Sequence, residues 1–294
     1  MNTLHLAPPA ADVRRQAREN LNGQWPLAVL VTFLAGVMGG QSGLPSISFD
    51  ITSLIPEDLS PFFDGAGITD METLMALMGE MLPAIVTALV TALAFFTVLF
   101  IIGPCIHWGL CRFRLSLIDG DKPTVGVLFS GFKSVFLKAL GIQVLQTLIL
   151  LAVALATVAV SAIPIALLVP ADLPWLALPW LIAVAGGVIG GAVMILLICR
   201  YSMSYYALVD NPELRAVDAL RESAHMMKGN KRKLICLWLS FIGWALLCLL
   251  TGGIGTLFYA PYVGQAEAVF YHHVSGRAAI REAVEELSFI TEGL

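Results

Sequence analysis

Residues 82–104 read LPAIVTALVTALAFFTVLFIIGP and contain no charged side chain. An α-helix of about 20 apolar residues crosses the hydrocarbon core of a bilayer, so this run predicts a membrane-spanning helix. The whole chain has the same character, since 58% of its 294 residues are hydrophobic and 13% are charged. Soluble domains carry about 25% charged residues, and we therefore predict an all-α, polytopic membrane protein.

Similar apolar stretches recur along the chain and predict a helical bundle of about six transmembrane helices. The expected spans are 25–40, 82–104, 139–168, 176–199, 234–250 and 254–271. A short glycine-rich turn separates the last two, so residues 234–271 also allow one long helix or a re-entrant hairpin. Basic residues flank this region on both sides, which favours an even number of crossings. Two spans and a re-entrant hairpin both satisfy that condition.

The Lys and Arg residues fall on one side of the expected membrane. Three precede the first span, five lie between the second and third, seven between the fourth and fifth, and two follow the sixth, which accounts for all 17. The intervening loops, 41–81 and 169–175, contain acidic residues but no Lys or Arg. Because basic loops stay in the cytosol, we expect both termini to be cytosolic and 41–81 to be an acidic external loop. The expected location is a cytoplasmic-type membrane.

The N-terminal segment allows one alternative. Arg14, Arg15 and Arg18 precede an apolar stretch that ends in small residues, as they do in a secretory signal peptide. We favour a retained first span, because the charged region is long and no clear Ala-x-Ala cleavage site follows.

The cytosolic segments resemble one another at a spacing of roughly 100 residues, which indicates an internal repeat. Residues 115–123 (LSLIDGDKP) parallel residues 206–212 (YALVDNP), and each reads as a span end, a turn and a proline in the first turn of a new helix. We expect three helical hairpins, each introduced by a short interfacial helix. The clearest of these helices covers 212–228 and stops at Gly229 and Asn230.

Three stretches in the C-terminal third resemble a known family. They are YSMSYYALVDNP (201–212), SAHMMKGNKRKL (223–234) and GIGTLFYAPY (253–262). In them the chain resembles a family of bacterial multi-pass integral membrane proteins catalogued as domain of unknown function nine hundred and seventy-five. It is also distantly similar to the membrane domain that accompanies some glycerophosphodiester phosphodiesterases. The resemblance implies a membrane location and a shared bundle, but no activity.

Few polar residues in the expected spans are candidates for function. Glu267 is the one charged residue within a span, Gln265 lies beside it, and His107 lies at the cytosolic end of the second span. Ionisable groups deep in a membrane indicate proton or ion coupling. Glu267 lies about 7 Å of helix from the cytosolic boundary, however, where an interfacial or structural role fits better.

Two further groups are candidates for lipid contact and for helix packing. The interfacial helix is followed by Lys231, Arg232 and Lys233. Their basic side chains are candidate contacts for anionic lipid headgroups, or they serve only to set the topology. Two overlapping G-x-x-x-G patterns are formed by Gly186 with Gly190 and by Gly187 with Gly191. Such patterns allow two helices to approach closely, either within one chain or at a homodimer interface.

No segment carries a catalytic, nucleotide or metal signature. Cys105 and Cys111 are six residues apart with only His107 between them, which is not a zinc-ligand spacing, and we expect no cofactor. We predict a non-enzymatic membrane protein that interacts with the lipid bilayer and with a membrane-protein partner or a second copy, and not with nucleic acid. The alternative is a small-solute or lipid transporter.

Overall fold

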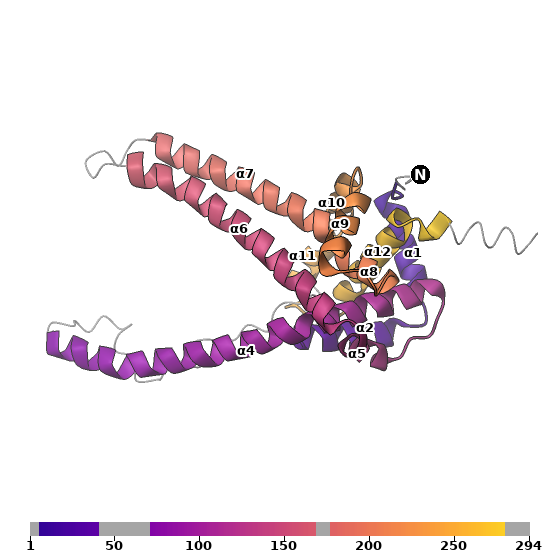
Figure 1. Ribbon diagram of the computed structural model, residues 1–294, viewed down its shortest axis with the longest axis horizontal. Coiled ribbons are helices and arrows are strands. Elements are labelled where there is room, and N and C mark those ends of the chain that lie inside the picture. The colour runs from indigo at the N-terminus through magenta and orange to yellow at the C-terminus, as the bar shows by residue number, and fades with distance from the viewer. Residues whose placement is uncertain (1–5, 41–70, 169–176, 280–294) are drawn as a thin grey trace, which may run out of the picture.

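The computed structural model describes residues 6–40, 71–168 and 177–279, and the regular structure in these ranges is entirely helical. Figure 1 shows a compact head from which long helices extend as two diverging arms. One arm is the N-terminal part of α4 (Met71–Asp119), and the other is a hairpin of α6 (Phe136–Leu168) and α7 (Ala177–Tyr201).

The arms are apolar on their surface. No residue in the most apolar stretch of α4, α6 or α7 is buried, and side chains such as Leu89 (67% exposed) and Val188 (67% exposed) point away from the protein. Soluble monomers do not expose continuous apolar surfaces of this size. These surfaces are therefore suited to the apolar interior of a membrane.

Four helices in the described residues are long and apolar enough to cross a membrane: Ile85–Asp119, Phe136–Ala162, Leu181–Asp210 and Lys231–Leu250. The sequence predicted about six. The first expected span is the short helix α2 (Trp25–Val37), about 20 Å long. The sixth is α12 (Thr256–Val274), most of whose side chains are buried among other helices.

The remaining elements build the head. They are α1 (Ala10–Leu21), the 3₁₀ turn η3 (Val125–Phe129), α5 (Gly131–Ser134), α8 (Ser204–Asp210), α9 (Ala216–Met226), α10 (Lys231–Leu239) and α11 (Ile242–Leu250). Helix α12 lies at the centre and packs against α1, α2, α4 and α11. Its neighbour α1 contributes Val13, Ala17 and Leu21, which recur at helical spacing and are buried.

The boundaries differ from the expected ones in three places. Helix α4 begins at Met71, so the last part of the expected external loop 41–81 is helical, and residues 41–70 lie outside the described range. The interfacial helix expected at 212–228 is α9, which begins only at Ala216 because Arg215 before it is extended. The fifth expected span is divided near Phe241 into α10 and α11.

Glycines in the left-handed conformation form three turns in the head. Before α2 and α10 the chain turns through Gly23 (φ +80°) and Gly229 (φ +80°), and Gly120 (φ +84°) makes a similar turn after α4. A left-handed conformation is favourable only for glycine, which explains this residue at the three turns. Gly23 joins α1 to α2, Gly229 joins α9 to α10, and Gly120 joins α4 to the segment that precedes η3.

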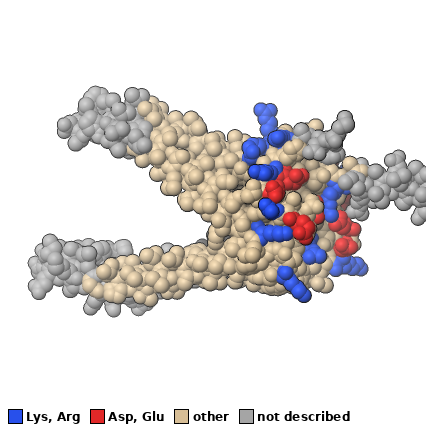
Figure 2. Space-filling view, viewed as in Figure 1, with Lys and Arg blue, Asp and Glu red and all other residues tan. Residues whose placement is uncertain are grey.

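Charge follows the division into head and arms. Residues 82–111, 139–168 and 177–199 contain no charged side chain. Figure 2 shows Lys, Arg, Asp and Glu gathered on the head, while the described parts of both arms are uniformly uncharged on the visible face.

Candidate functional site

One face of α4 carries polar groups where the apolar arm enters the head. His107, Cys111 and Arg114 are four and three residues apart, so they project from the same side of the helix. Cys111 and Arg114 are buried, and His107 is half-buried. This face of α4 packs against α8 and α12, and we call the contact region the polar cluster.

Arg114 lies at the centre of the polar cluster, and its side chain contacts α8 and α12. Its Nη1 donates a hydrogen bond to the Tyr206 hydroxyl (3.3 Å), and that hydroxyl donates in turn to the carbonyl of Gly264 (3.5 Å). Gln265 Nε2 donates to the backbone carbonyl of Arg114 (3.2 Å). A Cβ atom at position 264 would overlap the guanidinium, so any larger residue there would require the buried Arg114 side chain to shift.

Glu267 lies one helical turn further along α12 and is half-buried. The indole Nε1 of Trp238 in α10 donates a hydrogen bond to its Oε1 (3.0 Å). The carboxylate also attracts the Arg114 guanidinium electrostatically. Both interactions are made within the protein, so Glu267 helps to hold α10 and α4 against α12.

His107 lies at the other end of the cluster. Its ring meets the ring of Tyr205 edge-on, with centroids 4.5 Å apart, and its Nε2 lies 3.8 Å from the Cys111 Sγ. The Tyr205 hydroxyl donates to Gln143 Oε1 in α6 (3.1 Å). The structure therefore places His107, Gln265 and Glu267 in one cluster, with Arg114 between them.

A second network borders the polar cluster on the α8 side. The ring of Tyr206 stacks on that of Tyr271 (5.2 Å between centroids), and the Tyr271 hydroxyl donates to Asp210 Oδ2 (2.7 Å). Arg277 forms ion pairs with Asp210 (3.4 Å) and with Asp119 (3.8 Å). These contacts join the C-terminal ends of α4, α8 and α12.

The predicted lipid contacts form the first turn of α10. Arg232 is exposed, whereas Lys231 and Lys233 are half-buried. Lys233 Nζ donates a hydrogen bond to the backbone carbonyl of Ala7 and so anchors the N-terminal segment. The three basic residues thus do not form one uniform exposed surface.

The two G-x-x-x-G patterns of α7 face different surroundings. Gly186 and Gly190 lie against α6, where a Cβ at Gly190 would overlap Thr157. Nothing lies within 4 Å of a Cβ placed at Gly187 or Gly191. One pattern therefore packs the hairpin, and the other faces outward from it.

Sequence reasoning did not single out Arg114, Tyr206 or Trp238. Arg114 was counted only among the topology-setting basic residues, although its helical spacing from His107 and Cys111 would have indicated a shared polar face. Tyr206 and Trp238 carried no sequence signal, because their partners are 58 and 29 residues away along the chain.

The chemistry of the cluster fits a role in packing. Among the described residues, no group of three or more His, Cys, Asp and Glu side chains could hold a metal ion. The cluster instead joins helices through an arginine, an acid, tyrosines and an indole. Apart from the contact between His107 and Cys111 within α4, its hydrogen bonds connect different helices.

A family model described as "Protein of unknown function (DUF975)" matches residues 8–278 of the chain. No curated protein matches, and no solved structure matches.

Proposed function

The chain belongs to the DUF975 family of proteins of unknown function, and we propose that it is a non-enzymatic, multi-pass protein of a bacterial cytoplasmic membrane. It crosses the membrane six times, keeps both termini in the cytosol, and interacts through its head with membrane lipids or a partner membrane protein.

The observation that carries this proposal is the separation of charge from apolar surface. The described parts of the arms, from residue 82 of α4 and up to Cys199 of α7, carry no charge, whereas Lys and Arg lie in the head. Positively charged segments remain on the cytosolic side, so the charged part of the head is the cytosolic part. The arms, together with the apolar helices α2 and α11 and the uncharged first part of α12, are the embedded part. The family match agrees with an uncharacterised membrane protein.

Six crossings require α10 and α11 to traverse the membrane and α12 to return. The turn between α11 and α12 fits a position in or beyond the membrane and not in the cytosol, because Leu250 (84% exposed) and Ile254 (70% exposed) are apolar and uncovered there. Basic residues precede α10 and follow α12, so the number of crossings between them is even.

Cysteine labelling of intact cells tests this topology in a Cys236→Ser background, since Cys236 is an exposed native thiol. We expect a membrane-impermeant maleimide to label Ile254→Cys in intact cells, and to label Lys122→Cys only after permeabilisation. Protection of Ile254→Cys both before and after permeabilisation, while Lys122→Cys is labelled after permeabilisation, would replace the two spans by a re-entrant hairpin.

The interaction with lipids or partners is tested by extracting the protein in native lipid nanodiscs and identifying by native mass spectrometry what stays bound. A stoichiometric lipid or protein is the expected result. A bare monomer would contradict the proposal and would move attention to transport.

A small-solute or lipid transporter is the second candidate, and the electrostatic attraction between the buried Arg114 and the half-buried Glu267 favours it. Such groups inside a membrane protein are common in proton and ion pathways. Flux into proteoliposomes that is present in the wild type and lost in Glu267→Gln would support this function over the first.

A further inference from the structure

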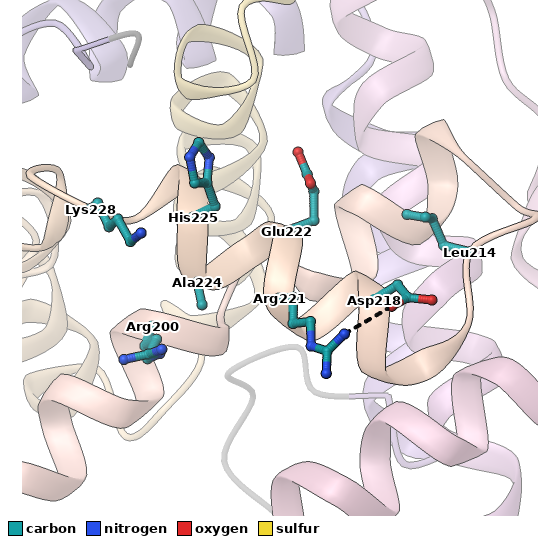
Figure 3. A pocket seen from close by; sticks show the side chains of 8 residues that line it. All are labelled: Arg200, Leu214, Asp218, Arg221, Glu222, Ala224, His225 and Lys228. Carbon is teal, nitrogen blue, oxygen red and sulfur yellow. Dashed lines mark ion pairs between the residues drawn. The ribbon is translucent and has the colours of Figure 1, made fainter. Parts of the chain in front are cut away.

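A pocket of about 450 Å³ lies on the surface of the head, between the C-terminal end of α7 and the interfacial helix α9. Figure 3 shows its charged lining: Arg200 comes from α7, and Asp218, Arg221, Glu222, His225 and Lys228 come from α9 and the turn that follows it. None of these residues belongs to the polar cluster.

A buried serine fixes the two walls of the pocket relative to each other. The Ser223 hydroxyl donates a hydrogen bond to the backbone carbonyl of Arg200 (2.9 Å) and accepts one from the backbone N–H of Met203 (3.2 Å). Serine at this position thus ties α9 to the end of α7. The side chains on either side are presented from a rigid frame, which lowers the entropic cost of binding.

The balance of charge in the pocket is positive. Arg221 forms an ion pair with Asp218 (3.7 Å), and Figure 3 shows the two side chains directed toward each other. Glu222 projects from the opposite side of α9 to Arg221 in the same view. Arg200 and Lys228 are both exposed and line the pocket together with the small side chain of Ala224. Because Arg221 is paired with Asp218, these two are the cations that an anion would meet.

An apolar stripe leads from the pocket along the arm. Arg200 is the first charged residue after the uncharged segment of α7. Leu196, Val193 and Ile189 precede it by 4, 7 and 11 residues and so lie on the same face of the helix. All three are exposed, at 44%, 41% and 65%.

We propose that this pocket binds the phosphate of an anionic phospholipid, with the headgroup between Arg200 and Lys228 and the acyl chains along Leu196, Val193 and Ile189. Basic residues close to a membrane surface attract anionic lipids in this way. A free phosphate ion would use the two cations but would leave the adjoining apolar stripe unused. The inference rests on the proposed function, because it requires the head to lie at the cytosolic surface of the membrane.

Titration of the full-length protein in detergent with phosphatidylglycerol, followed by native mass spectrometry, tests the site. Variant R200Q/K228Q removes the two cations, and variant R15Q/R18Q removes two exposed arginines of α1 as a matched control. We expect the wild type and the control to bind one lipid molecule tightly, and R200Q/K228Q to bind it about tenfold more weakly. Equal binding by all three proteins would overturn the assignment.

Competition with inorganic phosphate distinguishes a phospholipid headgroup from a free phosphate ion as the ligand of the pocket. We expect millimolar phosphate to leave the bound phosphatidylglycerol in place. Displacement of the lipid with retention of phosphate would show a site for the free ion and would overturn the proposal. The experiment also distinguishes an error in the location of the site from an error in the proposed function. If the lipid binds elsewhere on the protein, R200Q/K228Q still retains it. If the protein binds no lipid at all, no form of the protein retains any.

Discussion

The guanidinium of Arg277 lies 3.4 Å from the carboxylate of Asp210, whose side chain is only 17% exposed. The same guanidinium lies 3.8 Å from Asp119, which is 41% exposed. The two aspartates occupy matching positions in the repeated segments LSLIDGDKP and YALVDNP. One arginine after α12 therefore joins the equivalent ends of two repeats.

We expect Asp210→Ala to destabilise the head more than Asp119→Ala. Asp210 also accepts the hydrogen bond from the Tyr271 hydroxyl, so its loss leaves that buried donor without its acceptor and leaves Arg277 with only the more exposed Asp119. The expected cost is about 2–3 kcal/mol, against about 1 kcal/mol or less for the exposed pair with Asp119. Thermal unfolding of the two variants in the same detergent measures the difference, and equal shifts would show that the buried network does not stabilise the head.

Gly264→Ala should disrupt the contact between α12 and α4. The new Cβ would overlap the Arg114 guanidinium, which lies in a packed interior with little room to move. Overpacking of this kind costs about 1–3 kcal/mol. Gly243→Ala in α11 is the matched control, since nothing lies within 4 Å of the added atom. A melting temperature that falls for the control as much as for Gly264→Ala would contradict the close approach.

The sequence predicted the membrane class, the helical architecture and the segregation of charge because these follow from local composition. The hydropathy over about 20 residues and the positions of Lys and Arg can be read from the sequence without knowing which distant residues are in contact. The same information places Glu267 and Gln265 on one helix. It says nothing of Trp238, which reaches Glu267 only after α10 folds back onto α12.

The number of membrane-spanning helices was predicted less completely than the fold class, and the reason is physical. Hydropathy does not distinguish an apolar helix that faces lipid from one that faces protein. Helix α12 is a case of the second kind, with Phe270 and Tyr271 buried in the head, and the number of crossings beyond the four long apolar helices therefore remains a proposal. The two glycine patterns of α7 show the same limit, since only one of them faces α6.

We expect Gly190→Ala to loosen the α6–α7 hairpin and Gly191→Ala to leave it intact. The first substitution places a methyl group against Thr157, whereas the second places it in open space. The expected cost at position 190 is about 1–3 kcal/mol, and the neighbouring substitution should be neutral or slightly stabilising because alanine favours a helix over glycine. Thermal unfolding in one detergent compares the two. A larger effect at position 191 would indicate that this outer face packs against another molecule.

The hydrogen bond between Trp238 and Glu267 should contribute measurably to stability. Trp238→Phe removes the donor and leaves a half-buried carboxylate that has lost a partner, at an expected cost of about 1.5–3 kcal/mol for a bond to a charged group. Trp244→Phe is a suitable control, because Trp244 is 51% exposed in the neighbouring α11.

A double-mutant cycle isolates that contact from the general effect of losing an indole. In a Glu267→Gln background the acceptor is neutral, so Trp238→Phe should cost about 1 kcal/mol less than it does in the wild type. The cycle is read from unfolding free energies of the four proteins in one detergent. Costs that add to within about 0.5 kcal/mol would mean that the indole stabilises the head by packing alone. Glu267 would then be free of a structural partner in α10, which would strengthen the case for transport.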